Sequence, residues 1–173
     1  AELEQVNGIG PGRSAAFVRG FRESEGQVDA ELSLAEQLGV RLIARGDAEY
    51  PALLGGIEDA PPLLYCRGQL APESDRYPLG IVGSRHATAY GIEQAERFAS
   101  TLGSSGLTIV SGGARGIDTA AHQGALAAKG RTVCVLGTGL AIVFPPENKD
   151  LFDRIAENGA VVGEDVMAKS MCL

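Results

Sequence analysis

The stretch that decides the fold spans residues 79–118 and reads LGIVGSRHATAYGIEQAERFASTLGSSGLTIVSGGARGID. Two short apolar runs, Leu79–Val82 and Leu107–Val110, each end in a glycine-rich loop. Between them, from Tyr90 to Ser104, apolar side chains recur at the spacing of an amphipathic helix. Continuously apolar strands that alternate with helices are typical of a parallel sheet covered on both faces. The stretch therefore predicts an α/β fold.

The same alternation extends to both sides of this stretch. Downstream, the pattern predicts a helix, a strand, a helix and a strand at residues 117–129, 132–136, 148–157 and 160–162. Upstream, apolar runs predict two further strands at residues 40–44 and 63–67. We therefore expect one α/β domain over residues 39–173, built on a parallel sheet.

Three glycine-rich loops follow three of the expected strands. Because ligands of an open parallel sheet bind at the carboxyl ends of its strands, we expect these loops to gather at one edge. Small residues let backbone N–H groups approach an anion, and arginine presents a bidentate fork that fits phosphate. The candidate phosphate-binding residues are Gly83, Ser84 and Arg85, then Ser111, Gly112, Gly113, Ala114, Arg115 and Gly116, then Gly137, Thr138 and Gly139.

Charge restricts how such an anion would be held. The chain has 173 residues, a net charge of −7 and a pI near 4.8, so it repels a polyanion at long range. Binding must therefore be local, through a few basic side chains and backbone N–H groups in a cleft. The chain has neither a Walker A motif nor GxGxxG after a strand, which disfavours ordinary nucleotide-hydrolysing and dinucleotide sites.

The sequence predicts no cofactor and no metal site. Cys66, Cys134 and Cys172 are odd in number and widely spaced, which disfavours both a disulfide framework and a zinc site. Asp118 and His122 have the i, i+4 spacing of a metal pair or a general base. We favour a structural role for both, in which Asp118 bonds loop N–H groups at a helix start and His122 bonds across to another loop. No membrane-spanning stretch or signal peptide is apparent, and a cytoplasmic location is expected.

Together these motifs resemble the DprA/Smf family of bacterial DNA-processing proteins. The resemblance runs from Tyr50 to about Glu164 and includes GSR at 83–85, SGGARGID at 111–118, AHQGAL at 121–126, GTGL at 137–140 and FPPEN at 144–148. It implies an extended Rossmann-like domain that binds single-stranded DNA without catalysing a reaction. It further implies that the strand is protected from nucleases and delivered to a RecA-type recombinase during natural transformation.

The resemblance also carries over to particular residues. Arg85 stands at the family's DNA-contacting arginine, and the loop 111–116 matches the backbone cradle beside it. Many members carry a DNA-contacting lysine where this chain has Pro146, and Lys149 is the candidate to replace it. The family continues beyond Glu164 with strands that complete the sheet and form a homodimer surface. We therefore expect a domain that is incomplete at its C-terminal end, with residues 165–173 unmatched in the family.

The N-terminal region, residues 1–38, predicts a small helical hairpin unit. A tight turn followed by a short helix at 14–21 resembles the loop and second helix of a helix-hairpin-helix motif. A polar linker at 23–29 and another helix at 30–38 complete the unit. A helical hairpin that only packs explains the same residues. The candidate second DNA contact consists of Gly8, Gly10, Gly12 and Arg13.

Two other functions fit parts of the pattern. Rossmann-like nucleoside-monophosphate hydrolases carry related Ser-Gly-Gly loops, so a nucleotide-binding enzyme is the main alternative. Those enzymes also carry a PGGxGTxxE segment, which this chain lacks. A degenerate chain that no longer binds DNA is the third reading.

Overall fold

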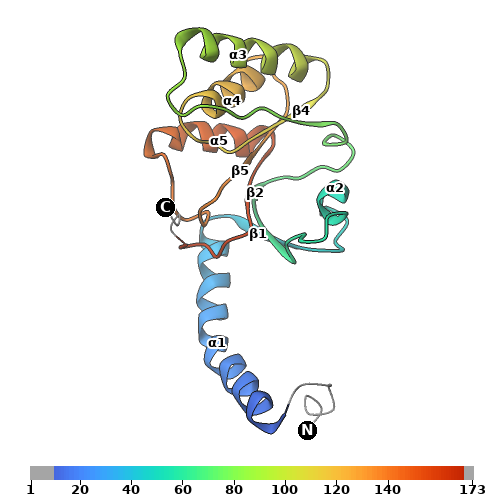
Figure 1. Ribbon diagram of the computed structural model, residues 1–173, viewed down its shortest axis with the longest axis vertical. Helices are drawn as coiled ribbons and strands as arrows, with labels where there is room; N and C mark the ends of the chain where they lie inside the picture. The colour runs from blue at the N-terminus through green and yellow to red at the C-terminus, as the bar shows by residue number, and fades with distance from the viewer. Residues whose placement is uncertain (1–9, 170–173) are drawn as a thin grey trace. The chain divides into compact units, whose positions relative to one another are not determined.

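The computed structural model describes residues 10–169. The chain divides into two compact units, residues 1–37 and 38–173. In the first unit, helix α1 (Pro11–Gln37) runs without interruption (Figure 1). The expected linker at 23–29 is wrong because its glutamates and glutamine favour a helix, and one interior glycine costs only about 1 kcal/mol. Within the described residues, every helix is too short or too polar to cross a lipid bilayer.

A six-stranded sheet forms the centre of the second unit, in the order β1-β2-β6-β5-β4-β3. Strands β3 to β6 are parallel to one another, whereas β2 is antiparallel to both β1 and β6. This confirms the α/β fold with a mostly parallel sheet. Between β1 and β2 the chain forms only the four-residue helix α2 (Ala52–Gly55) and returns to pair the two strands antiparallel, without a long crossover helix. The strands are β1 (Val40–Ala44), β2 (Leu63–Gly68), β3 (Pro78–Gly80), β4 (Thr108–Ser111), β5 (Thr132–Val135) and β6 (Ala160–Gly163).

The crossover helices all pack on one face of the sheet. They are α3 (Ala89–Ser104), α4 (Ile117–Ala127) and α5 (Lys149–Asn158). Ile109 of β4 packs against Ala99 of α3 and Ala125 of α4, and Cys134 of β5 packs against Phe152 of α5. Because β3 to β6 lie in sequence order, right-handed crossovers place every helix on the same side. The expectation that helices cover both faces is therefore wrong.

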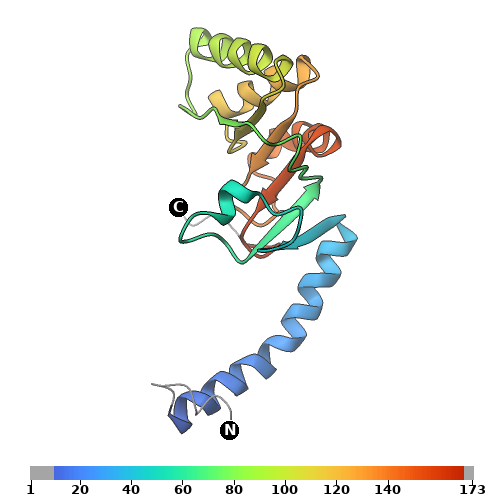
Figure 2. The ribbon, with the colours of Figure 1, turned by 90° about the vertical axis from the view of Figure 1, so that its right-hand side faces the viewer.

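The opposite face is covered only in part, by the segment 45–77. Figure 2 shows α2 on the other side of the strands from α5. Tyr50 and Leu70 join Leu64, Val133 and Val162 in a buried cluster on this face. Beside the cluster lies a largely apolar groove of about 650 Å³, and Val135 in its wall is 47% exposed. The groove follows from the one-sided crossovers, which leave this face without long helices.

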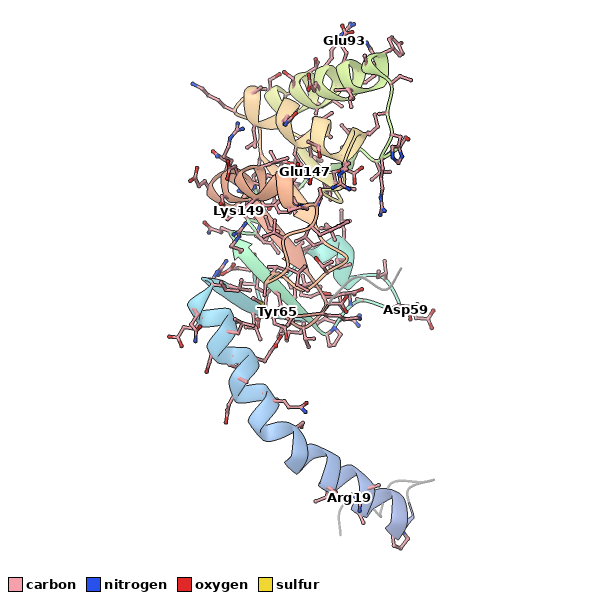
Figure 3. The ribbon with its side chains drawn as sticks, turned by 90° about the vertical axis from the view of Figure 1, so that its left-hand side faces the viewer. Arg19, Asp59, Tyr65, Glu93, Glu147 and Lys149 are labelled. Carbon is pink, nitrogen blue, oxygen red and sulfur yellow. The ribbon has the colours of Figure 1, made fainter. Side chains whose placement is uncertain are left out.

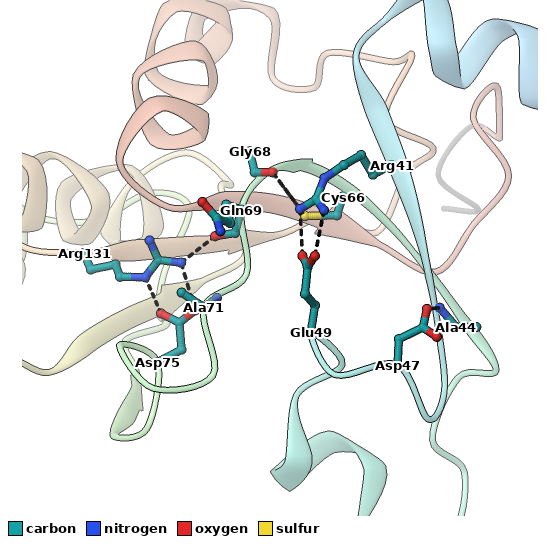
Figure 4. Close-up of polar contacts among 10 residues, drawn as sticks. All are labelled: Arg41, Ala44, Asp47, Glu49, Cys66, Gly68, Gln69, Ala71, Asp75 and Arg131. Carbon is teal, nitrogen blue, oxygen red and sulfur yellow. Dashed lines mark hydrogen bonds and ion pairs between the residues drawn. The ribbon is translucent and has the colours of Figure 1, made fainter.

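Two arginine–carboxylate pairs fasten the segment between β1 and β4 (Figure 4). Arg131 donates to Asp75 through Nε at 2.6 Å and Nη2 at 2.9 Å, and Thr108 Oγ1 donates to the same carboxylate at 2.9 Å. Burial raises the pKa of Asp75, but these hydrogen bonds outweigh it and hold the pKa below its usual value. Arg41 and Glu49 form the second pair, at 2.9 and 3.0 Å, and both are more exposed.

Candidate functional site

The first two glycine-rich loops, 83–88 and 111–116, contact each other. The backbone N–H of Ile117, the first residue of α4, donates to Ser84 O at 3.2 Å. Gly116 has a φ of +79°, and a Cβ there would lie 2.2 Å from Ser84 O. A Cβ on Gly83 would lie 2.7 Å from Ile117 Cγ1. The loops therefore meet only because these positions lack side chains, and Arg85 lies next to the loop 111–116.

Both loops carry backbone donors that the protein does not use. In the part of the chain that the structure describes, no hydrogen bond to another protein group is made by the backbone N–H groups of Gly83, Ser84, Arg85, Gly112, Arg115 and Gly116. All six residues are exposed or half-buried. Because N–H groups need a partner, these donors are available to water or to an anion. The partial positive charge at the start of α4 adds to their attraction for an anion.

Two buried side chains hold the second loop in shape. Asp118, 7% exposed, accepts a hydrogen bond from the N–H of Ala114 at 3.4 Å, which confirms its expected structural role. Asn148 donates through Nδ2 to Gly113 O at 3.0 Å and to Thr119 Oγ1 at 2.8 Å. Asn148 was not among the site residues expected from the sequence. Its only signal is its place in the FPPEN motif.

His122 is buried in the helix-covered face of the sheet. Its Nδ1 lies 2.8 Å from the hydroxyl of Thr132, which itself donates to Ile109 O at 2.7 Å. Nδ1 therefore carries the proton and donates, whereas Nε2 has no partner in residues 10–169. Burial lowers the pKa of His122 to about 4, against a smaller opposite effect of the Ser111 carbonyl. The expected bond to another loop is wrong, since the partner belongs to β5.

Arg85 and Arg115 differ in what their side chains contact. Arg85 is exposed and makes no hydrogen bond or ion pair with the described residues. Arg115 pairs with Glu147 through both Nε and Nη2, the latter at 3.1 Å, and its guanidinium lies over the Phe144 ring at 5.8 Å from the centroid. The hydrogen bonds from Arg115 lower the pKa of Glu147. Glu147 is a second residue that the sequence did not identify as part of the site.

Lys149 begins α5, directly after the short 3-10 helix η2 (Pro146–Asn148) that carries Glu147 (Figure 3). Its Nζ lies 2.9 Å from Asp153 Oδ2, an ion pair one helical turn along. The hydrogen bond to Asp153 raises the pKa of Lys149. The lysine is thus exposed but already paired with a carboxylate.

The third loop, residues 137–139, makes contacts of its own. The N–H of Gly139 donates to Lys169 O at 2.9 Å, and a Cβ at Gly139 would lie 2.0 Å from Val166 O. Thr138 is 2% exposed and donates to Ile142 O at 3.4 Å. Of the three residues in this loop, only Gly137 is exposed. The structure therefore engages Thr138 and Gly139 in contacts of their own rather than in the pair of loops 83–88 and 111–116.

The candidate contact in the N-terminal unit is described only in part. Gly10 and Gly12 are exposed, and Gly12 belongs to the first turn of α1, closed by a bond from Ser14 N to Gly10 O at 3.0 Å. Gly8 and the side chain of Arg13 lie outside the described residues.

Comparison with known families gives one match that covers most of the chain. The family described as DNA recombination-mediator protein A matches residues 41–172. The match is wider than the expected Tyr50–Glu164, so the expectation that residues 165–173 have no counterpart is wrong for all but the last of them.

Known proteins of similar sequence carry related names. Protein Smf of Synechocystis is 40% identical over 132 residues, which are 75% of this chain and 33% of that protein. DNA processing protein DprA of Bacillus subtilis is 31% identical over 152 residues, 88% of this chain and 51% of that protein. The chain thus spans between a third and a half of the length of these two relatives.

Solved structures extend the likeness to three dimensions. DNA processing protein A from Streptococcus pneumoniae matches with a TM-score of 0.72 and 38% identity, over 83% of this chain and 50% of that one. DNA processing protein A from Helicobacter pylori matches with a TM-score of 0.66 and 26% identity, over 77% of this chain and 59% of that one. The structure of the second protein is described as giving insight into its single-stranded DNA binding mode.

Proposed function

This chain belongs to the DNA recombination-mediator protein A family, and from that premise we propose that it binds single-stranded DNA at the loops 83–88 and 111–116. The observation that carries the proposal is the contact between these two loops, with six unengaged backbone N–H groups beside Arg85. Such donors fit phosphate oxygens, which are the same in every nucleotide. Sequence preference is therefore expected to be slight.

The negative charge of the chain determines how the strand would be held. At a net charge of −7, the protein as a whole repels DNA, so affinity must come from short-range contacts. Each phosphate that a basic side chain neutralises contributes about −0.7 to the slope of log K against log salt for a single strand. Arg85, which no carboxylate pairs among the described residues, is the side chain most available for such a contact.

The wider role that we propose follows the family. The bound strand would be protected and passed to a RecA-type recombinase during natural transformation in the cytoplasm, by a homodimer of the full-length protein. We also propose a second DNA contact in the N-terminal region that the sequence predicts over residues 1–38, at Gly8, Gly10, Gly12 and Arg13. We propose binding without catalysis, because Asp118 and His122 are buried and engaged in structural hydrogen bonds.

The test compares Arg85→Ala with Arg154→Ala. Arg154 is an exposed arginine of α5, outside both loops, and its replacement removes the same charge. Fluorescence anisotropy with a labelled oligothymidine should show binding weakened several-fold in Arg85→Ala, with the salt slope reduced in magnitude by about 0.7. Arg154→Ala should bind as the wild type does, and a duplex of the same length should bind less tightly. Equal losses in the two variants, or equal affinity for both forms of DNA, would count against the proposal.

A further inference from the structure

The pair Arg115–Glu147 occupies the site that we propose for phosphate. Arg115 offers its Nε and Nη2 donors to the two oxygens of Glu147. A phosphodiester presents two oxygens to a guanidinium in the same bidentate manner. Carboxylate and phosphate therefore compete for one edge of this side chain.

The surrounding contacts keep Glu147 close to Arg115. The next residue, Asn148, is 5% exposed and is bonded to Gly113 and Thr119, so the segment that carries Glu147 is fixed to the loop 111–116. The two paired side chains are themselves 53% and 52% exposed. Exposed ion pairs contribute little to stability and exchange readily with other partners. An entering anion can thus take the edge of Arg115, but the displaced carboxylate stays nearby and repels it.

We propose that Glu147 occupies Arg115 in the free protein as a substitute for phosphate and so lowers the affinity of this site for every anion. An isolated phosphate, which makes few contacts other than with Arg115, then binds only weakly because it does not displace the carboxylate. A strand that also contacts Arg85 and the amides of both loops gains enough to displace the carboxylate. Glu147 thereby weakens the binding of every anion by a similar factor, so that only a strand with further contacts to both loops is still bound. This inference rests on the proposed function, because it assigns the same loops to a phosphodiester strand.

The test uses Glu147→Gln, which keeps the shape of the side chain and removes its charge. Isothermal titration with inorganic pyrophosphate should show binding about tenfold tighter than in the wild type, the effect expected when one charge a few ångströms from an anion is removed. The affinity for the labelled oligothymidine should increase by a similar factor. Thermal melting verifies that the variant is folded.

Two further variants show whether the gain comes from Arg115. Glu49→Gln breaks another bidentate arginine–glutamate pair and makes the same change in net charge, so it should leave both affinities unchanged. In the double variant Arg115→Gln/Glu147→Gln, the increase in affinity should disappear. The inference is overturned if Glu147→Gln binds neither ligand more tightly, if Glu49→Gln gains equally, or if the gain persists in the double variant. If pyrophosphate binding gains as expected but no variant binds the oligonucleotide, the proposed function fails, and only the competition between Glu147 and phosphate at Arg115 stands.

Discussion

Acidification should destabilise this protein through His122. The imidazole is 0% exposed and its pKa is lowered by burial from 6.5 to about 4. Between these values the unfolded chain takes up a proton at this residue and the folded chain does not. Protons therefore favour unfolding. The unfolding free energy keeps its full value above pH 6.5 and decreases as the pH falls towards 4. A difference of this size corresponds to ~3 kcal/mol of unfolding free energy, a large share of the stability of one domain.

Urea unfolding followed by far-ultraviolet circular dichroism measures this loss at pH values from 7 to 4. His122→Asn keeps an amide donor for the Thr132 hydroxyl and does not titrate, so its curve should decline less steeply than that of the wild type. Carboxylates contribute equally to both curves and cancel in the difference. His86→Asn, which removes the exposed histidine instead, should retain the wild-type pH dependence. Parallel curves for the wild type and His122→Asn between pH 6.5 and 4 would refute the reasoning.

Two further predictions concern packing. Gly116→Ala should lower the unfolding free energy by about 3 kcal/mol and abolish binding of the oligonucleotide, because its Cβ would lie 2.2 Å from Ser84 O at a φ of +79°. Gly137→Ala, with nothing within 4 Å of the added Cβ, is the control that should unfold as the wild type does in urea. Asp75→Ala should lower the unfolding free energy by about 2–4 kcal/mol, because it leaves the partly buried guanidinium of Arg131 without its carboxylate. Equal losses from Asp75→Ala and from Glu49→Ala, which breaks a more exposed pair, would contradict that account.

Most strands and helices of the second unit were predictable from local pattern. The expected helix at Tyr90–Ser104 differs from α3 by one residue, and the expected strand at residues 40–44 has the bounds of β1. A short, continuously apolar run that ends in a glycine-rich loop is typical of a buried strand and fits few other structures. The one-sided cover of the sheet was not predictable in the same way. It depends on the spatial order of β3 to β6, which no local pattern contains.

The site was predictable where its residues are close in sequence. The loops at 83–88 and 111–116 stand out because glycine and arginine follow apolar strands directly. Asn148 and Glu147 were missed because their partners Gly113 and Arg115 lie more than thirty residues away in the chain. Gly139 was expected to bind phosphate, but its amide is taken by Lys169, a contact that also depends on the tertiary fold.

The residues of β3, at one edge of the sheet, bear on whether a further strand can add to that edge. Ile81 donates its N–H to Val110 of the neighbouring strand, so by alternation the N–H of Leu79 faces the same way. The outward positions of β3 are then Pro78 and Gly80, and proline has no N–H to give. A second chain that added a strand along this border would find a single backbone donor. One donor is too few for a continuous ladder of hydrogen bonds. The exposed edge of β3 is therefore a poor template for the addition of strands from other chains.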